Sequence, residues 1–346
     1  MGKLIRILSI DGGGIRGIIP AQILTVLERK LQDRTQDENC RVADYFDMIA
    51  GTSTGGILAC LYLYPDAETS RPRYSADEAV DVYLQHGREI FELPLSRRIR
   101  SAAGLADEKY SAHGLEKLLA NYFKSAYLSD LLKPCLITAY DIRRRRAMFF
   151  TQHEARDRAS KDFPLTDVTR ATSAAPTYFE TARIKSRTDV SYPVIDGGVF
   201  ANNPTLCAYA EGRNHFGAKA ADMAILSLGT GEVRKPYPYA EAKDWGAVGW
   251  MRPLVDIMMS GVSETVDYEC RTAFEAVGVP DQYLRVNVEM SRLPDGVTCD
   301  MDDVSKDNLL GLRELGEEAA ERRNKELDAF VDLLIDGRSE PQGEER

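Results

Sequence analysis

The 346-residue sequence lacks the features that mark several common classes of protein. No apolar run reaches the ~18 to 20 residues that a membrane span needs, and the first residues lack the cationic, apolar and small-residue segments of a signal peptide. Six cysteines stand singly, with no C-x-x-C pair or His-rich spacing, which argues against a disulfide framework or a zinc site. We therefore expect a reduced, cytoplasmic protein that meets a membrane only at its surface.

The sequence also lacks a basic excess. Its 44 Lys and Arg against 54 Asp and Glu give a formal net charge of −10 at pH 7, whereas binding to a nucleic-acid polymer normally needs a basic footprint. With 44% hydrophobic and 28% charged residues, the composition is that of a globular protein that buries a large core. Internal repeats and linkers rich in Pro, Gly or Ser are missing too, so one α/β domain is the economical interpretation.

Two β-turn-α units open the chain. A β-branched segment at 4–10 runs into consecutive glycines and a helical pattern at 18–31, and the same layout returns with a strand at 46–50 and an apolar helix at 57–64. Two such units in succession predict a parallel sheet covered by helices. The later segments with regular patterns predict helices at 76–91, 114–123 and 308–335, and strands at 134–140, 148–151, 192–195 and 224–228.

The second turn has the form of a nucleophile elbow. Ser53 stands between Gly51 and Gly55, after a predicted buried strand and before a predicted helix. Glycines two before and two after the serine allow a sharp strand-to-helix turn that exposes its hydroxyl above a helix N-terminus. G-x-S-x-G also arises by chance in glycine-rich turns, but the flanking strand and helix favour a catalytic serine.

The first turn contains Gly12, Gly13 and Gly14, which with Gly17 match G-x-G-x-x-G. A dinucleotide site would need an acidic residue at the end of the next strand, where this chain has the serine turn, and no G-K-[ST] follows as a P-loop requires. Three consecutive glycines before a helix instead present backbone N–H groups that a developing oxyanion can approach closely.

An activated serine needs a base, and the usual base is histidine. The four histidines, His86, His113, His153 and His215, lie in settings that mark none of them as catalytic. A carboxylate is the better candidate. Asp196 follows a predicted strand in a third glycine turn, and the carboxyl ends of strands in a doubly wound sheet lie along one edge.

An unperturbed aspartate, with a pKa of about 3.9, is a weak base for a serine. It must therefore be held within hydrogen-bonding reach of Ser53 and shielded from water. Asp196 stands beside two glycines in this turn, Gly197 and Gly198. Taken alone, an aspartate in this position is more often a turn residue.

These residues together resemble the patatin-like phospholipases. The resemblance consists of the motifs at 11–17, 51–55 and 196–198, which occur in the order typical of that family. The segments at 171–179 and 226–231 are also similar to the family. Three ordered motifs are far more specific than any one of them.

The resemblance implies a three-layer α/β/α sandwich with a mainly parallel central sheet. We expect one catalytic domain over residues 1–337, with the core motifs within 5–275 and a polar tail at 338–346. A helical insertion is expected at about 66–132 and a helical C-terminal region at about 305–337.

The resemblance also implies a lipid acyl hydrolase of the phospholipase A or lysophospholipase type, which needs no metal or cofactor. Ser53 would be its nucleophile, Asp196 its general base and the Gly12–Gly14 loop its oxyanion hole. Arg16 matches the basic position of the family, where it either supports the loop or forms an ion pair on the helix surface. The expected partner is a phospholipid or another acyl-ester lipid at a membrane surface.

Three alternatives remain open at this stage. An acyltransferase would use the same dyad with an acceptor alcohol in place of water. Some bacterial members of the family are similar to defence effectors that degrade membranes when a cyclic nucleotide activates them, but nothing in the sequence identifies a nucleotide pocket. A non-enzymatic storage or scaffold role is disfavoured by the intact Ser53 and Asp196 motifs.

Two segments suggest contact with lipid. The stretch 235–259 holds both tryptophans together with tyrosines and methionines, which suit a membrane interface and an adaptable acyl groove. A loop and core helix that cover the sheet explain it equally simply. The arginine run 143–146 would attract anionic head groups, or it is a solvated hairpin tip.

Overall fold

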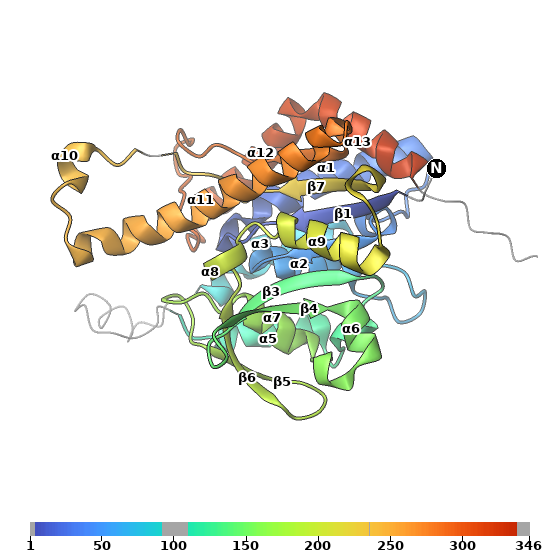
Figure 1. Cartoon of the computed structure of the whole chain (residues 1–346), viewed down its shortest axis with the longest axis horizontal. Helices are drawn as coiled ribbons and strands as arrows, with labels where there is room; N and C mark the ends of the chain where they lie inside the picture. The colour runs from blue at the N-terminus through green and yellow to red at the C-terminus, as the bar shows by residue number, and fades with distance from the viewer. Residues whose placement is uncertain (1–3, 92–109, 235, 338–346) are drawn as a thin grey trace, which may run out of the picture.

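The computed structural model describes residues 4–91, 110–234 and 236–337, so part of the helical insertion expected at about 66–132 and the predicted tail 338–346 lie outside the described residues. Within them, eight strands form one sheet in the order β5-β6-β3-β2-β1-β7-β8, and β4 pairs with β3 (Figure 1). The strands are β1 (Ile5–Ile10), β2 (Met48–Gly51), β3 (Cys135–Asp141), β4 (Arg146–Thr151), β5 (Ala182–Lys185), β6 (Ser191–Asp196), β7 (Met223–Leu228) and β8 (Tyr283–Val286).

The sheet is mostly parallel, as predicted. The pairs of β1 with β2 and β7, of β2 with β3 and of β7 with β8 are parallel. The strands β4, β5 and β6 add antiparallel pairs at the other end. The predicted strand positions agree with β1, β2, β3, β4, β6 and β7 to within a few residues, whereas β5 and β8 were not predicted.

Helices cover both faces of the sheet, which confirms the three-layer α/β/α architecture (Figure 1). The longer described helices are α1 (Ile18–Thr35), α2 (Thr54–Leu63), α3 (Ala76–Ile90), α5 (His113–Phe123), α7 (Leu165–Thr172), α9 (Thr205–Phe216), α11 (Ala247–Ala276), α12 (Lys306–Arg322) and α13 (Asn324–Asp336). Short ones are α6 (Gln152–Asp157), α8 (Gly198–Ala201) and α10 (Tyr239–Ala242).

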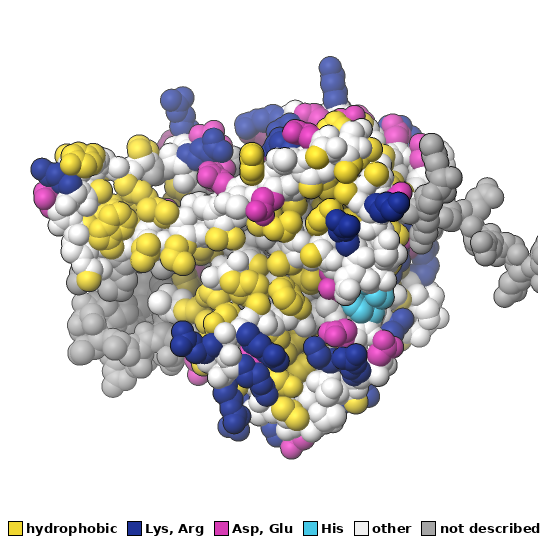
Figure 2. Space-filling model, in the orientation of Figure 1, with side chains coloured by type: hydrophobic (Ala, Val, Ile, Leu, Met, Phe, Trp, Pro, Cys, Tyr) yellow, Lys and Arg dark blue, Asp and Glu magenta, His cyan; other side chains and the backbone are white. Residues whose placement is uncertain are grey.

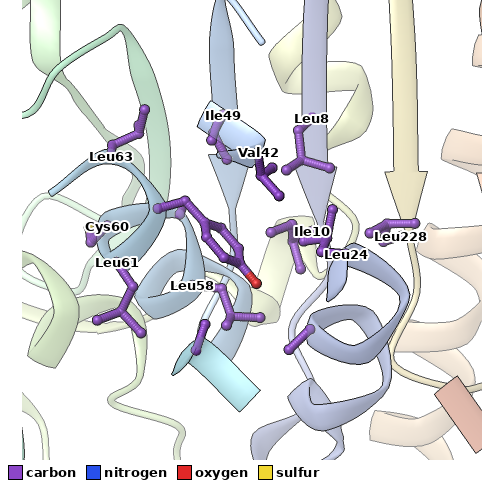
Figure 3. Close-up of a cluster of buried hydrophobic side chains, with 14 of the residues drawn as sticks. Leu8, Ile10, Leu24, Val42, Ile49, Leu58, Cys60, Leu61, Leu63 and Leu228 are labelled. Carbon is purple, nitrogen blue, oxygen red and sulfur yellow. The ribbon is translucent and has the colours of Figure 1, made fainter. Parts of the chain in front are cut away.

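Strand β1 divides its side chains between the two faces. Ile5 and Ile7 are buried in a core cluster with residues of α9 and α11. Leu8 and Ile10 point into the larger cluster with α1 and α2, part of which Figure 3 shows. Alternation along a strand is the expected period of two, and because both faces are covered the strand is apolar almost throughout.

The C-terminal region contains two helices, not the single helix predicted at 308–335. Helix α12 ends at Arg322 and α13 begins at Asn324. Both pack on α1, and Gly316 allows this close contact because a Cβ there would lie 2.7 Å from the Ile19 carbonyl oxygen. The apolar periodicity continues across the break, so the sequence pattern did not reveal it.

The core-helix interpretation of 235–259 is wrong for most of that stretch. Its described large side chains include several that are exposed, among them Tyr239, Trp250 and Met258. The stretch forms α10 and the first part of α11, which extends away from the body of the molecule (Figure 1). Within the described ranges, none of the helices combines the length and apolar content that crossing a bilayer requires.

Candidate active site

The ends of β2 and β6 meet on the same edge of β3. Strand β4 pairs with residues 136–141 of β3 and so occupies one edge of that strand. Strands β2 and β6 share the other edge, where Gly51 of β2 lies beside Ile137 and Asp196 of β6 lies beside Ala139. The two strands run toward each other. We had expected Asp196 to end a strand parallel to the others, but β6 is antiparallel to β3 and reaches the serine turn from the opposite direction.

Ser53 occupies a strained elbow between β2 and α2. Its backbone has φ 55° and ψ −121°, a conformation that costs a non-glycine residue energy and is found mainly at functional sites. A Cβ at Gly51 would lie 2.2 Å from the Gly55 carbonyl oxygen, and a Cβ at Gly55 would lie 2.2 Å from the Ile10 carbonyl oxygen. Both glycines are therefore required for the turn to close, and Ser53 itself is only half-buried.

Three buried threonines hold this elbow in place. The Ser53 N–H donates to Thr172 Oγ1 at 2.8 Å. The Thr52 hydroxyl lies 2.7 Å from Thr138 Oγ1 and donates to the Ala201 carbonyl at 2.6 Å. Thr172 falls within the segment 171–179 that resembled the family, but Thr138 lay in a predicted strand without any motif to mark it.

Asp196 is buried, and its environment changes its acidity. Desolvation raises the pKa of its carboxyl from 3.8 to about 6, while hydrogen bonds from the Ser53 side chain and the Gly198 N–H oppose the rise. The Gly198 bond is 2.7 Å long. At Gly197 a Cβ would lie 2.1 Å from Thr138 Oγ1, so glycine is required there for β6 to approach β3. The carboxylate is thus both in contact with Ser53 and shielded from water.

The glycine loop after β1 lies against the elbow. A Cβ at Gly12 would lie 3.3 Å from Ser53 Cβ. The Gly12 N–H donates to the Asn202 carbonyl at 3.0 Å, which removes it from the oxyanion donors assigned to 12–14. For Gly13 and Gly14, no hydrogen-bond acceptor of the N–H is found in the described chain. These two N–H groups are therefore the remaining candidates for oxyanion donors in this loop.

A buried ion pair stabilises this loop. Arg285 of β8 holds Asp11 in a two-point contact, with Nη1 to Oδ1 at 2.9 Å and Nη2 to Oδ2 at 2.5 Å, and it also donates to Ser227 at 2.8 Å. Burial raises the pKa of Asp11, and the charge of Arg285 opposes that rise. Arg285 stands 274 residues from Asp11 and outside every motif, so sequence reasoning missed it.

Arg16 is buried and does not form a surface ion pair. No described carboxylate lies within ion-pair distance of its guanidinium, and burial lowers its pKa. Its backbone N–H donates to the Gly13 carbonyl at 3.2 Å, and Nε makes a long contact of 3.5 Å to the same oxygen. Of the two expectations for Arg16, these contacts favour support of the loop.

The histidines lie elsewhere. His153 forms an ion pair with Glu211 at 2.9 Å and stacks on His215 at 3.9 Å between ring centroids. His86 contacts Glu89, and His113 is the first residue of α5. Among the described residues, none of these histidines hydrogen-bonds or forms an ion pair with Ser53. The described residues also contain no cluster of three or more His, Cys, Asp or Glu that could hold a metal ion.

Comparisons with known proteins identify the family. The family model "Patatin-like phospholipase" matches residues 8–209, which include the serine, the aspartate and the glycine loop. Patatin-like protein 2 of Oryza sativa subsp. indica is 32% identical, and the match covers 98% of this chain and 90% of that protein.

Two further matches deserve separate mention. The potato (Solanum tuberosum) protein named "Probable inactive patatin-3-Kuras 1" is 32% identical over 97% of this chain and 94% of its own length. The solved structure of VipD from Legionella pneumophila is 13% identical, with a TM-score of 0.38, and the match covers 92% of this chain and 67% of that one. The family model and the near-complete coverage of the plant relative lead to one conclusion: the chain belongs to the patatin-like phospholipase family, a family of lipid acyl hydrolases.

Proposed function

We propose that the chain cleaves fatty-acyl esters of glycerophospholipids, as a phospholipase A or lysophospholipase, through Ser53 and Asp196. One observation carries the proposal. The strained Ser53 donates its side-chain hydrogen bond to a buried carboxylate whose pKa is raised to about 6. A general base works best when its pKa lies near the operating pH, and this carboxylate is still mostly ionised at pH 7.

In the first step, Asp196 takes the proton of the Ser53 hydroxyl as Oγ attacks the ester carbonyl carbon. The carbonyl oxygen becomes an oxyanion, which the N–H groups of Gly13 and Gly14 stabilise; each such donor is worth about 3 kcal/mol. The bond from the carbonyl carbon to the alcohol oxygen then breaks. The neutral Asp196 carboxyl protonates the leaving alkoxide, and the acyl group stays on Ser53.

In the second step, water replaces the alcohol. Asp196 takes a proton from water as the hydroxide oxygen attacks the acyl-enzyme carbonyl, and the same donors hold the second oxyanion. When the bond to Oγ breaks, Asp196 returns the proton to Ser53 and the fatty acid leaves. If an acceptor alcohol attacks instead of water, the same sequence of steps transfers the acyl group, so only the products separate hydrolase from acyltransferase.

The test is fatty-acid release from mixed phospholipid vesicles and from a short p-nitrophenyl ester, both in chelator. We expect Ser53→Ala and Asp196→Asn to lower the rate by about 10³-fold or more, as removal of a nucleophile or its base does in related dyads and triads. Ser160→Ala and Asp189→Asn, at exposed positions between α6 and α7 and in the β5–β6 turn, are the matched controls and should keep full activity.

The remaining outcomes separate the alternatives. A wild type that is inert yet labels at Ser53 with a serine-directed phosphonate would have a competent site that needs an activator or an acceptor. Transfer of the acyl group to an added alcohol, detected by product analysis, would identify an acyltransferase. Absence of labelling, or full activity in Ser53→Ala, would contradict the catalytic assignment.

A further inference from the structure

Helix α11 changes its surroundings along its length. Its C-terminal half packs on the sheet, where Val266, Cys270 and Phe274 are buried in the core cluster beside α9. With 30 residues the helix is ~45 Å long. Its N-terminal half therefore extends well beyond the sheet, and Figure 1 shows it as an arm that leaves the body together with α10.

The arm carries an exposed apolar face of its own. Trp250, Leu254, Ile257 and Met258 follow the spacing i, i+4, i+7, i+8 that places side chains on one face of a helix. All four are exposed, by 39%, 48%, 42% and 56%. By the same spacing Asp256 falls on the opposite side of the helix together with Met259, and Ser260, three residues after Ile257, borders the apolar face. An exposed apolar face of this size normally packs against a partner.

Aromatic rings reinforce this surface at its tip. Tyr237, Trp245 and Trp250 pack edge to face, with centroids 5.5 and 5.1 Å apart, and Tyr239 beside them is 82% exposed. Trp and Tyr are the side chains that concentrate at membrane–water interfaces because they have both an apolar ring and a polar group. The composition of the tip thus fits a lipid surface.

Basic side chains lie beside the apolar ones on the same face. Figure 2 shows hydrophobic side chains along the arm and over α8 and β3, with Lys and Arg gathered next to them near the β3–β4 turn. That turn contains Arg143, Arg144, Arg145 and Arg146, all exposed. Among described residues only Arg144 of these four forms an ion pair, with Asp141. In a chain with net charge −10, this local cluster is suited to anionic head groups.

The arm joins the body at the active site. Ser263, one residue beyond the exposed Val262, accepts hydrogen bonds from Asn203 Nδ2 at 3.5 Å and from Arg285 at 3.3 Å. Arg285 is the partner of Asp11 under the glycine loop. A lipid surface seated on the arm would therefore lie next to the turns that contain the catalytic residues.

We propose that the N-terminal half of α11, with α10 and the basic β3–β4 turn, is a docking surface for an anionic lipid bilayer. We call this set of residues, 237–262 and 143–146, the docking surface. This proposal rests on the proposed function in one respect: the role of docking is to bring the acyl-ester substrate to Ser53. Apolar side chains enter the interface while the arginines contact head groups, as in other interfacial amphipathic helices.

The experiment compares binding of the full chain to sedimented vesicles of phosphatidylcholine with and without phosphatidylglycerol. All proteins carry Ser53→Ala so that no lipid is consumed. We expect Leu254→Ser with Met258→Ser to lower partitioning about tenfold or more. Leu310→Ser, at a leucine of α12 that is 42% exposed, is the matched control and should bind as the parent does.

A second variant tests the charges separately. Arg143→Ser with Arg145→Ser should weaken binding to anionic vesicles several-fold and remove much of its salt dependence, while binding to neutral vesicles stays the same. Both substitutions are at exposed positions, so thermal unfolding should match that of the parent.

Two results would overturn the docking surface. The first is unchanged binding by the Leu254→Ser, Met258→Ser variant. The second is a wild type that self-associates in light scattering and becomes monomeric in that variant, since a second copy of the chain would then be the partner.

Failure of the proposed function gives a different result. In that case the wild type releases no fatty acid from vesicles or the soluble ester, yet binds vesicles in the manner described. Both proposals are supported together if the wild type hydrolyses lipid and the Leu254→Ser, Met258→Ser change lowers that hydrolysis while hydrolysis of the soluble ester stays unchanged.

Discussion

At the scale of single residues, the raised pKa of Asp196 predicts the pH range in which the proposed Ser53–Asp196 dyad works. The base must be ionised to accept the Ser53 proton, and its pKa is about 6 instead of 3.8. We therefore expect kcat/KM for a soluble ester to fall about tenfold per pH unit below about pH 6 and to level off above it. A pH–rate profile measures this directly. An acid limb near pH 4 would show that the carboxylate is solvated and not acting as proposed.

The oxyanion assignment depends on Gly13. A Cβ there would lie 2.2 Å from Thr230 Oγ1, and this hydroxyl is fixed by donating to the Gly12 carbonyl at 2.6 Å. Gly13→Ala must therefore displace the loop, and we expect a loss of about 10²- to 10³-fold in kcat. With the soluble ester as substrate, which needs no lipid docking, Gly261→Ala is the control, because nothing lies within 4 Å of its Cβ. Circular dichroism should show both variants folded, and full activity in Gly13→Ala would remove the loop from the mechanism.

Local motifs predicted the candidate reacting residues but not the groups that hold them in the structure. Ser53 and its glycines could be read from sequence because the sharp turn imposes its own requirements on neighbouring residues. The occupied Gly12 N–H and the burial of Arg16 could not, since both depend on Asn202 and on segments that pack over the loop from far along the chain. The local pattern therefore predicted the chemistry and left its support undetermined.

At the scale of elements, β8 stabilises the glycine loop through Arg285. Replacement by methionine would leave Asp11 buried without its counter-charge, and we expect Arg285→Met to lower the free energy of unfolding by about 3 to 5 kcal/mol. Urea unfolding measures the effect. Arg322→Met is the control, since its pair with Glu318 is exposed and contributes at most about 0.5 kcal/mol.

The same variant should respond to pH in a defined direction. Arg285 lowers the pKa of Asp11, so its removal raises that pKa further above the value in the unfolded chain. A folded-state pKa above the unfolded one gives stability that is present at low pH and lost as pH rises. The deficit of Arg285→Met relative to wild type should therefore shrink as the pH is lowered. A deficit that does not depend on pH would mean that packing, and not charge, is what Arg285 supplies.

Whether a segment forms a helix or a strand was easier to predict than which other segment it pairs or packs with. The β-turn-α units at the N-terminus follow from periodicity and glycine turns, and they are present as β1, α1, β2 and α2. The direction of β6 was not predictable, because an antiparallel strand has the same local pattern as a parallel one. The exposed arm of α11 was not predictable either, because apolar residues at helical spacing form the same sequence pattern whether they face a core or solvent.

At the scale of the whole molecule, the match to the family model ends before the last strands and helices of the fold. It covers residues 8–209, whereas β7 pairs with β1 in the interior of the sheet and β8 pairs with β7. Met301, just before α12, accepts the Ile15 N–H at 2.8 Å and lies against Gly14. The C-terminal third of the chain thus completes both the sheet and the support of the active-site loop.

A fragment of residues 4–209 should therefore fail to fold. It would leave β1 with an unpaired edge, expose the face of the sheet that α11 covers and remove the helices α12 and α13 from α1. We expect the full chain to unfold cooperatively on heating and the fragment to show no cooperative transition and to aggregate. A fragment with native circular dichroism and a sharp melting transition would mean that the first 209 residues hold a complete core, and that β7, β8 and the C-terminal helices serve the site alone.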